Sequence, residues 1–124
     1  LKFVDKVSRG VPIDRYGDGS SSRDYTYIDD VVDGVIRALD TPLGYQIYNL
    51  GNGRPTRLND FIRLVEQHSG KQALINVMPE QPGDVPRTCA DISKARELLG
   101  YDPQTPFSEG IAKLVKWYNE SARA

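Results

Sequence analysis

The chain has 124 residues with a formal net charge of −1, and 39% of the residues are hydrophobic. This length predicts a single domain, residues 1–124, with one modest core. The near-neutral charge argues against a partner that is a nucleic acid or an anionic membrane, and no apolar run approaches the roughly 18 residues of a membrane span. One cysteine, Cys89, excludes an internal disulfide framework; we expect a buried free thiol and a reducing, cytoplasmic compartment.

The first 27 residues predict a helix end and two short strands. Residues 1–9 carry the apolar spacing of the last turns of a helix, which Gly10 would end. Because the pattern opens inside a helix, we expect the chain to be part of a longer protein. Residues 11–16 predict an edge strand, since Pro12 cannot donate a hydrogen bond to a sheet. Residues 17–22 form a loop by composition, and residues 24–27 have the character of a second short strand.

Residues 28–39 form the clearest helix in the sequence. Their large apolar residues recur at i, i+3, i+4, i+7, i+8 and i+11, which places them on one face. Asp29 and Asp30 lie in the first turn, where the helix macrodipole favours acids. Stabilisation of the helix start is the simpler interpretation of these two acids, and a metal-binding or acid–base role is the alternative. Thr41 and Pro42 end the helix.

Residues 45–50 form a nearly continuous apolar and aromatic run, typical of a strand buried on both faces of a parallel sheet. The Gly51-x-Gly53 turn that follows has some features of a phosphate-binding loop. However, Pro55 lacks an N–H and Thr56 occupies the position of the last glycine. The pattern therefore favours a tight turn over a cofactor site, with Thr56 capping the next helix.

The second half of the chain alternates helices with one strand. We expect helices at residues 57–69, at 92–99 and from 106 onward, and a strand at 73–78. Gly70 would end the first of these helices and Asp91 would cap the second. Thr105 followed by Pro106 marks the start of the last helix, whose final residues, 121–124, should fray. Short strands with about five helices predict an α/β protein.

Polar side chains gather in two parts of the sequence. A Pro-Gly turn and the extended segment after it present an amide, a carboxylate, a guanidinium and a hydroxyl: Gln81, Asp84, Arg87 and Thr88. This composition is typical of a wall that binds a polar ligand, and a second wall is predicted at residues 16–23. There Arg23 follows a Gly/Ser loop, and its guanidinium can grip a phosphate bidentately. A solvated arginine, or one paired with Asp18 or Asp24, is the alternative.

The sequence contains no recognisable catalytic centre. No serine motif accompanies His68, and neither CxxC nor HExxH occurs. No tyrosine is followed four residues later by a lysine. The residues alone therefore predict an α/β protein that binds a ligand.

Three blocks of sequence, in this order, resemble one family: YGDGSSSRDYTYIDDVVDGVIRAL, YNLGNG and MPEQPGDVPRTCADISKARELLGYDPQTPFSEGI. Together they look like the C-terminal, substrate-binding part of the extended short-chain dehydrogenase/reductases. More narrowly, they resemble UDP-glucuronate 4-epimerase and related NAD-dependent UDP-sugar 4-epimerases. The similarity covers about residues 3–118. It implies that the Rossmann half, with its NAD and its catalytic Tyr-x-x-x-Lys, is absent from these residues.

The resemblance also implies roles for five residues in binding a UDP-sugar. Tyr16 matches the position whose backbone lies along the uracil, and Arg23 matches the arginine that contacts the diphosphate. Asp84 matches the carboxylate that bonds the ribose hydroxyls, and Gln81 matches a second ribose or phosphate contact. Thr88 matches a position that lines the sugar pocket.

In these enzymes a hydride passes from sugar C4 to NAD, the 4-keto sugar rotates, and the hydride returns to the other face. The resemblance implies that this chain holds the nucleotide end, binds no NAD alone and is inactive alone. Because residues 28–39 and 45–50 pack in the Rossmann half of the family, we expect exposed apolar surface here, and either self-association or a missing partner half. Two alternatives stay open: a stand-alone oligomeric binding module, and the same half-site of a nucleotide-sugar 4,6-dehydratase or decarboxylase.

Overall fold

The computed structural model describes residues 1–122, which form five α-helices and four short strands. The helices are α1 (Lys2–Arg9), α2 (Ile28–Asp40), α3 (Leu58–Ser69), α4 (Ser93–Leu99) and α5 (Phe107–Ala122). The strands are β1 (Ile13–Tyr16), β2 (Ser22–Arg23), β3 (Thr56–Arg57) and β4 (Ile75–Met78). This composition confirms the predicted α/β class with short strands and about five helices.

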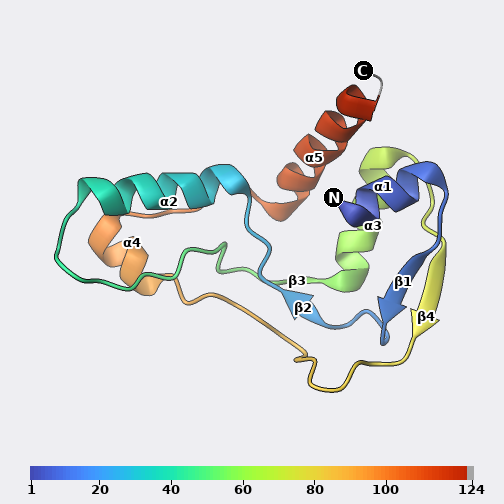
Figure 1. Ribbon diagram of the computed structural model, residues 1–124, viewed down its shortest axis with the longest axis horizontal. Coiled ribbons are helices and arrows are strands. Elements are labelled where there is room, and N and C mark those ends of the chain that lie inside the picture. The colour runs from blue at the N-terminus through green and yellow to red at the C-terminus, as the bar shows by residue number, and fades with distance from the viewer. Residues whose placement is uncertain (123–124) are drawn as a thin grey trace.

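The elements form two groups joined through β2, β3 and the segments beside them (Figure 1). One group holds α1, α3 and α5 with β1 and β4, and the other holds α2 and α4. Buried side chains form two clusters where one core was expected. The first consists of Val4, Val7, Ile13, Phe61, Ile62, Val65, Ile111 and Val115. The second consists of Ile92, Ala95, Leu99 and Tyr101.

Four aromatic rings join the three helices of the first group to the segment after β2. Phe61 lies at their centre, with ring centroids 5.3 Å from Phe3, 5.1 Å from Tyr25 and 5.3 Å from Phe107. Tyr25 also stacks on Phe107 at 5.0 Å. Such pairs add to the free energy gained by burying the rings. They anchor the chain immediately after Arg23 to the core.

Two small sheets place the residues of interest. β1 pairs with β4 in parallel, from Ile13 opposite Ile75 to Tyr16 opposite Met78. β2 pairs with β3 antiparallel, and its other edge meets the segment at residues 86–88. There the Ser22 N–H donates to the Pro86 carbonyl at 2.9 Å, and the Thr88 N–H donates to the Ser22 carbonyl at 3.1 Å. β2 is therefore held on both sides.

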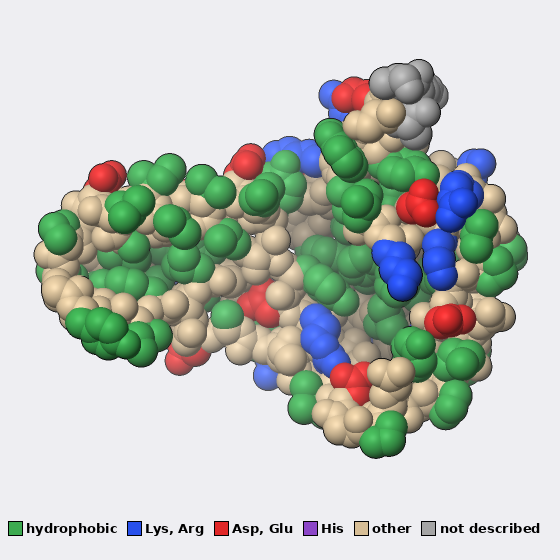
Figure 2. Space-filling model, viewed as in Figure 1, with side chains coloured by type: hydrophobic (Ala, Val, Ile, Leu, Met, Phe, Trp, Pro, Cys, Tyr) green, Lys and Arg blue, Asp and Glu red, His purple; other side chains and the backbone are tan. Residues whose placement is uncertain are grey.

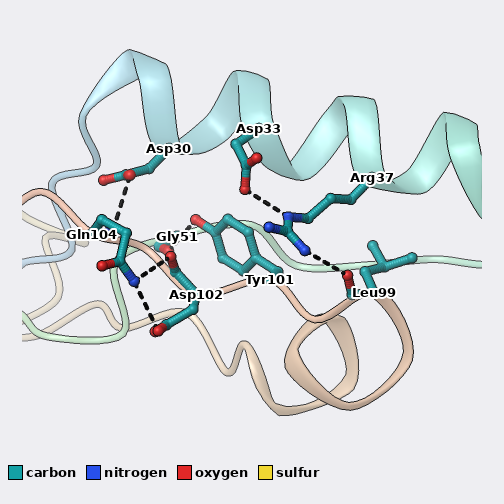
Figure 3. A network of polar contacts seen from close by, with 8 residues as sticks. All are labelled: Asp30, Asp33, Arg37, Gly51, Leu99, Tyr101, Asp102 and Gln104. Carbon is teal, nitrogen blue, oxygen red and sulfur yellow. Dashed lines mark hydrogen bonds and ion pairs between the residues drawn. The ribbon is translucent and has the colours of Figure 1, made fainter.

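Polar contacts tie α2 to the chain around Tyr101 (Figure 3). The Tyr101 hydroxyl donates to the Gly51 carbonyl at 2.6 Å, and burial raises the pKa of this phenol. Asp30 is buried, and its two carboxylate oxygens accept the backbone N–H groups of Gln104 and Thr105, each at 3.1 Å. The Asp30 carboxylate is thus engaged in joining α2 to the start of the last helix.

The helix predicted at residues 28–39 is present as α2, but its apolar face is not covered. Leu39 is 76% exposed, and Ile28, Val32, Val35 and Ile36 are also exposed. The side packed against the second cluster instead carries Gly34, where an added Cβ would meet Leu50 at 2.8 Å and Tyr101 at 3.1 Å. The prediction of a helix from the spacing of apolar residues is confirmed. The apolar face of this helix has no packing partner within residues 1–122.

Two predicted strands are wrong. Residues 45–50 form no strand, and the Tyr45 side chain is 90% exposed. A strand needs a neighbour to pair its backbone groups, and the described part of the chain offers none beside this segment. Residues 24–27 also lie outside any strand, because the strand pairing of β2 ends at Arg23 and Tyr27 already precedes α2.

The predicted helix ends and helix caps are confirmed in some cases and wrong in others. Gly10 and Gly70 end their helices in the left-handed conformation, as expected, and Gly100 ends α4 in the same way. The N-cap of α4 is Ile92, so the expectation that Asp91 caps this helix is wrong, although the Asp91 carboxylate accepts the Ser93 N–H at 3.0 Å. Thr56 belongs to β3 and does not cap α3, whose N-cap is Arg57.

Cys89 is free but exposed, so the expectation of a buried thiol is wrong. Of the residues expected to fray, Ser121 and Ala122 are helical, and residues 123–124 lie outside the described residues. Over residues 1–122, each helix is too short or too polar to cross a bilayer.

Candidate functional site

A pocket of about 260 Å³ opens between α1, β1, β2 and the turn that contains Asp84. Its lining combines three basic side chains, two carboxylates, three aromatic rings, a serine and a leucine: Lys2, Phe3, Lys6, Asp14, Tyr16, Ser21, Arg23, Tyr25, Leu58 and Asp84. Figure 2 shows basic side chains on opposite sides of a hollow on this face. Basic side chains and aromatic rings lining one pocket suit a ligand with an anionic part and a flat or apolar part.

Arg23 belongs to one predicted wall, residues 16–23, and contacts the other. Its Nη1 donates to the Ser22 carbonyl at 2.8 Å, and its Nη2 donates to the Asp84 carboxylate at 2.9 Å. The guanidinium side chain is 28% exposed and the Asp84 side chain is 53% exposed. The alternative pairing of Arg23 with Asp18 or Asp24 is therefore wrong, because its partner is Asp84 on the other wall.

A second hollow of about 280 Å³ continues the site on the other side of Asp84. Tyr16, Ser21 and Asp84 line both hollows, whereas Gln81 lines only the second. Thr88 lines neither; its hydroxyl accepts the Asp24 N–H at 3.4 Å. The structure thus brings Tyr16, Arg23, Gln81 and Asp84 together, and it places Thr88 against the strand that carries Arg23.

Tyr25 contributes an aromatic wall to the first hollow. Burial is the main cause that raises the pKa of its phenol, and the nearby Arg23 charge opposes that rise in part. The phenol is therefore neutral near pH 7, since its ordinary pKa is about 10. Its ring is fixed by Phe61 and Phe107, so this wall is rigid.

Asp24 is an organising residue that the sequence analysis missed. One carboxylate oxygen accepts the Asn52 N–H at 3.0 Å, and the other accepts the N–H groups of Gly53 and Ala90, each at 3.0 Å. Two segments far apart in sequence are therefore fixed beside β2. The turn at residues 51–53 does bind an anion, but the anion is a side chain of the same protein. A GNG turn with free N–H groups, and an acid next to Arg23, were the available signals.

An added Cβ at Gly51 would lie 2.6 Å from the Cβ of Ala90 and 2.9 Å from an Asp24 carboxylate oxygen. Only glycine permits this approach, so the first glycine of the turn has a packing explanation. Within residues 1–122 no three His, Cys, Asp or Glu side chains lie close enough to hold a metal ion. Asp29 and Asp30 lie in the first turn of α2, and the Asp30 carboxylate accepts the backbone N–H groups of Gln104 and Thr105.

Comparison with known proteins places this geometry in context. The family model described as GDP-mannose 4,6 dehydratase matches residues 1–114. UDP-glucuronate 4-epimerase of Thermodesulfobacterium geofontis is 40% identical over 122 residues, which cover 98% of this chain and 38% of that protein. The resemblance inferred from the three sequence blocks is thereby confirmed.

Solved structures agree with the sequence relatives. UDP-glucuronic acid 4-epimerase from Bacillus cereus, in complex with UDP-glucuronic acid and NAD, is 33% identical with a TM-score of 0.88. The match covers 96% of this chain and 38% of that one. UDP-glucose 4-epimerase from Thermotoga maritima, with UDP-glucose, is 31% identical with a TM-score of 0.89, covering 98% and 39%. The chain thus spans about two fifths of the length of these proteins.

Proposed function

This chain belongs to the GDP-mannose 4,6-dehydratase family, and we propose that it forms the UDP-sugar-binding part of an NAD-dependent nucleotide-sugar 4-epimerase. Residues 1–124 are then one substrate-binding domain of a longer enzyme. The observation that carries the proposal is the contact between Arg23 and Asp84 at the edge shared by the two hollows. Two residues 61 positions apart, with separate expected roles toward one nucleotide, meet in one site.

Each group at the site has a defined task in this proposal. The Arg23 guanidinium donates to the diphosphate oxygens, and the Asp84 carboxylate accepts from the ribose hydroxyls. Tyr16 lies along the uracil, Gln81 makes a further ribose or phosphate contact, and Thr88, which lines neither hollow, borders the sugar. Without ligand, Arg23 and Asp84 satisfy one another in an exposed pair. Such a pair contributes about 0–1 kcal/mol, so a nucleotide can replace it at little cost.

The contribution of this chain to catalysis is positioning. Holding the nucleotide end fixes the sugar relative to groups that this chain does not supply. NAD would supply the hydride chemistry in the whole enzyme. The Gly51-x-Gly53 turn does not fit a dinucleotide phosphate, because the N–H groups of Asn52 and Gly53 already donate to Asp24. We accordingly expect the isolated chain to bind no NAD and to show no epimerase turnover.

UDP titrated into the chain should bind, and Arg23→Ala should weaken that binding at least about tenfold, because a charge-assisted hydrogen bond contributes roughly 1.5–3 kcal/mol. Isothermal titration calorimetry measures the change. Arg63→Ala is the matched control: it removes the same charge from an exposed position on α3, where among residues 1–122 Arg63 pairs only with Asp60. Equal affinities for wild type and Arg23→Ala would contradict the assignment.

A second candidate function is the same half-site in a nucleotide-sugar 4,6-dehydratase or decarboxylase. It is favoured by the description of the matched family, which names a dehydratase that acts on GDP-mannose. Titration with GDP beside UDP separates the base preferences, because the base is read within this chain. A preference for GDP would replace the UDP-sugar epimerase by the dehydratase, whereas a preference for UDP supports the first proposal. UDP binding by the isolated chain also fits a stand-alone oligomeric binding module, so it does not separate that alternative from the first proposal.

The exposed apolar surface of α2 defines where this domain meets other protein. Besides Leu39 and its neighbours on the helix, Leu43, Tyr45 and Ile47 in the segment that follows are exposed. Apolar patches of this kind are rare on monomers. We propose that the remaining part of a longer enzyme covers this surface, since the relatives are more than twice as long. A second copy covers it when the chain is alone.

Leu39→Glu should reduce self-association of the isolated chain, because it puts a charge at the most exposed large apolar side chain of α2. The exposed position implies a small effect on folding stability, within about 0.5 kcal/mol. Sedimentation velocity over a concentration series measures the association. Val77→Glu, on the exposed strand β4, is the control with the same chemistry. If Val77→Glu dissociates the oligomer and Leu39→Glu does not, the contact lies at β4 and the α2 surface is not the interface.

A further inference from the structure

We propose that Lys6, with Lys2 one turn before it, forms a second phosphate-binding wall opposite Arg23; this inference rests on the proposed nucleotide function and deepens it. The diphosphate would lie between α1 and β2, held from both sides.

The geometry places both lysines at the pocket from one rigid element. Lys2 and Lys6 are four residues apart on α1, so their side chains project from the same face of the helix. Both line the 260 Å³ pocket together with Arg23, which reaches it from β2. Val4 and Val7 on the opposite side of α1 are buried in the first cluster, which fixes the helix.

The charges of the pocket show which cations are available to a ligand. The Arg23 guanidinium already forms an ion pair with Asp84 at 2.9 Å and donates a hydrogen bond to the Ser22 carbonyl. The other lining carboxylate, Asp14, accepts from the Asn76 side chain at 3.4 Å. Among residues 1–122, neither lysine lies within 4.0 Å of a carboxylate. The lysines are therefore the positive charges of this pocket that lack a counter-ion.

A nucleoside diphosphate brings at least two negative charges into the pocket. One arginine that also faces a carboxylate cannot neutralise both. A lysine ammonium acts as a point charge toward phosphate, with three donors on a flexible stem, so it can follow whichever phosphate Arg23 does not hold. This arrangement makes a specific prediction. Removing the Lys6 charge should weaken the binding of each ligand in proportion to its phosphate charge and should leave the affinity for uridine unchanged.

Calorimetric titrations of inorganic pyrophosphate, UDP and uridine into the 124-residue chain test this prediction. Lys6→Gln should weaken pyrophosphate and UDP about five- to tenfold and leave uridine within twofold. Lys6→Arg should bind like wild type, because it keeps the charge. Lys71→Gln removes the same charge at an exposed position after α3 and should change no affinity. Added salt should shrink the difference between Lys6→Gln and wild type.

Several outcomes separate this inference from the proposed function. Unchanged pyrophosphate and UDP affinity in both Lys6→Gln and the Lys2→Gln/Lys6→Gln double variant would overturn it, even if UDP binds well. Equal losses for UDP and uridine would also overturn it, since they would indicate a change of pocket shape. If wild type binds pyrophosphate in a Lys6-dependent way but prefers it to UDP, the nucleotide function fails and the phosphate wall stands.

Discussion

Tyr101→Ala should destabilise the chain by about 3–5 kcal/mol, the usual cost of removing a large buried aromatic side chain. Tyr101 is 0% exposed and lies at the centre of the second cluster, against Leu99 and below Gly34 of α2. Because few other side chains are buried in that cluster, removal of the Tyr101 ring should separate α2 and α4 from the rest of the fold. Urea denaturation followed by circular dichroism measures the change in the free energy of unfolding.

Two companion variants divide this effect into its causes. Tyr101→Phe keeps the packing but leaves the Gly51 carbonyl without its 2.6 Å donor, so it should cost about 1–3 kcal/mol. Tyr45→Ala removes the same side chain from a 90% exposed position and should stay within about 0.5 kcal/mol. Equal losses for Tyr101→Ala and Tyr45→Ala would mean that the second cluster does not stabilise this chain.

The phenol also predicts how stability depends on pH. Burial, and then the nearby carboxylates of Asp30 and Asp24, raise the pKa of Tyr101 above its ordinary value of 10.0. The folded state thus favours the protonated phenol. Its contribution is complete below that ordinary pKa and is lost as the pH rises through the raised value. Tyr101→Phe should abolish this alkaline loss, whereas Tyr45→Ala should not.

The contrast between α2 and the segment after it shows what the sequence could predict. The helical period of α2 depends on residues close together, so its presence and bounds followed from spacing. The exposure of its apolar face could not be predicted from spacing, because burial depends on which other elements pack against the helix. The run at residues 45–50 has strand character, yet a strand exists only with a partner. No spacing rule reveals that the partner is missing from residues 1–122.

The candidate site depended on the same distinction. Residue types at 16–23 and 81–88 predicted two polar walls, and the family resemblance predicted that both hold one ligand. Only the fold shows that Arg23 pairs with Asp84, because the contact spans 61 residues. The lysines of α1 escaped notice because their helix was interpreted only through its apolar residues. Asp24 was weighed only as an ion-pair partner of Arg23.

Asp24→Ala should therefore cost about 3–5 kcal/mol of stability, because it leaves three backbone N–H groups without their carboxylate acceptor. The effect should reach the proposed site as well. Asp24 follows Arg23 directly, and its own N–H donates to the Thr88 hydroxyl. Loss of the carboxylate frees the turn at residues 51–53 and the end of the segment at residues 86–90 that borders β2. UDP affinity should fall even where the variant remains folded.

Asp24→Asn sharpens this expectation, since it keeps the shape and removes the charge. The amide offers one acceptor oxygen where the carboxylate offers two, so the amide nitrogen must face either the Asn52 N–H or the pair from Gly53 and Ala90. The free energy of unfolding of Asp24→Asn should lie between those of wild type and Asp24→Ala. Asp33→Asn, at an exposed ion pair on α2, is the control and should stay within about 1 kcal/mol. If Asp24→Asn matches Asp33→Asn in both urea denaturation and UDP titration, the carboxylate does not organise the site, and the positions of Arg23 and Thr88 depend on strand pairing alone.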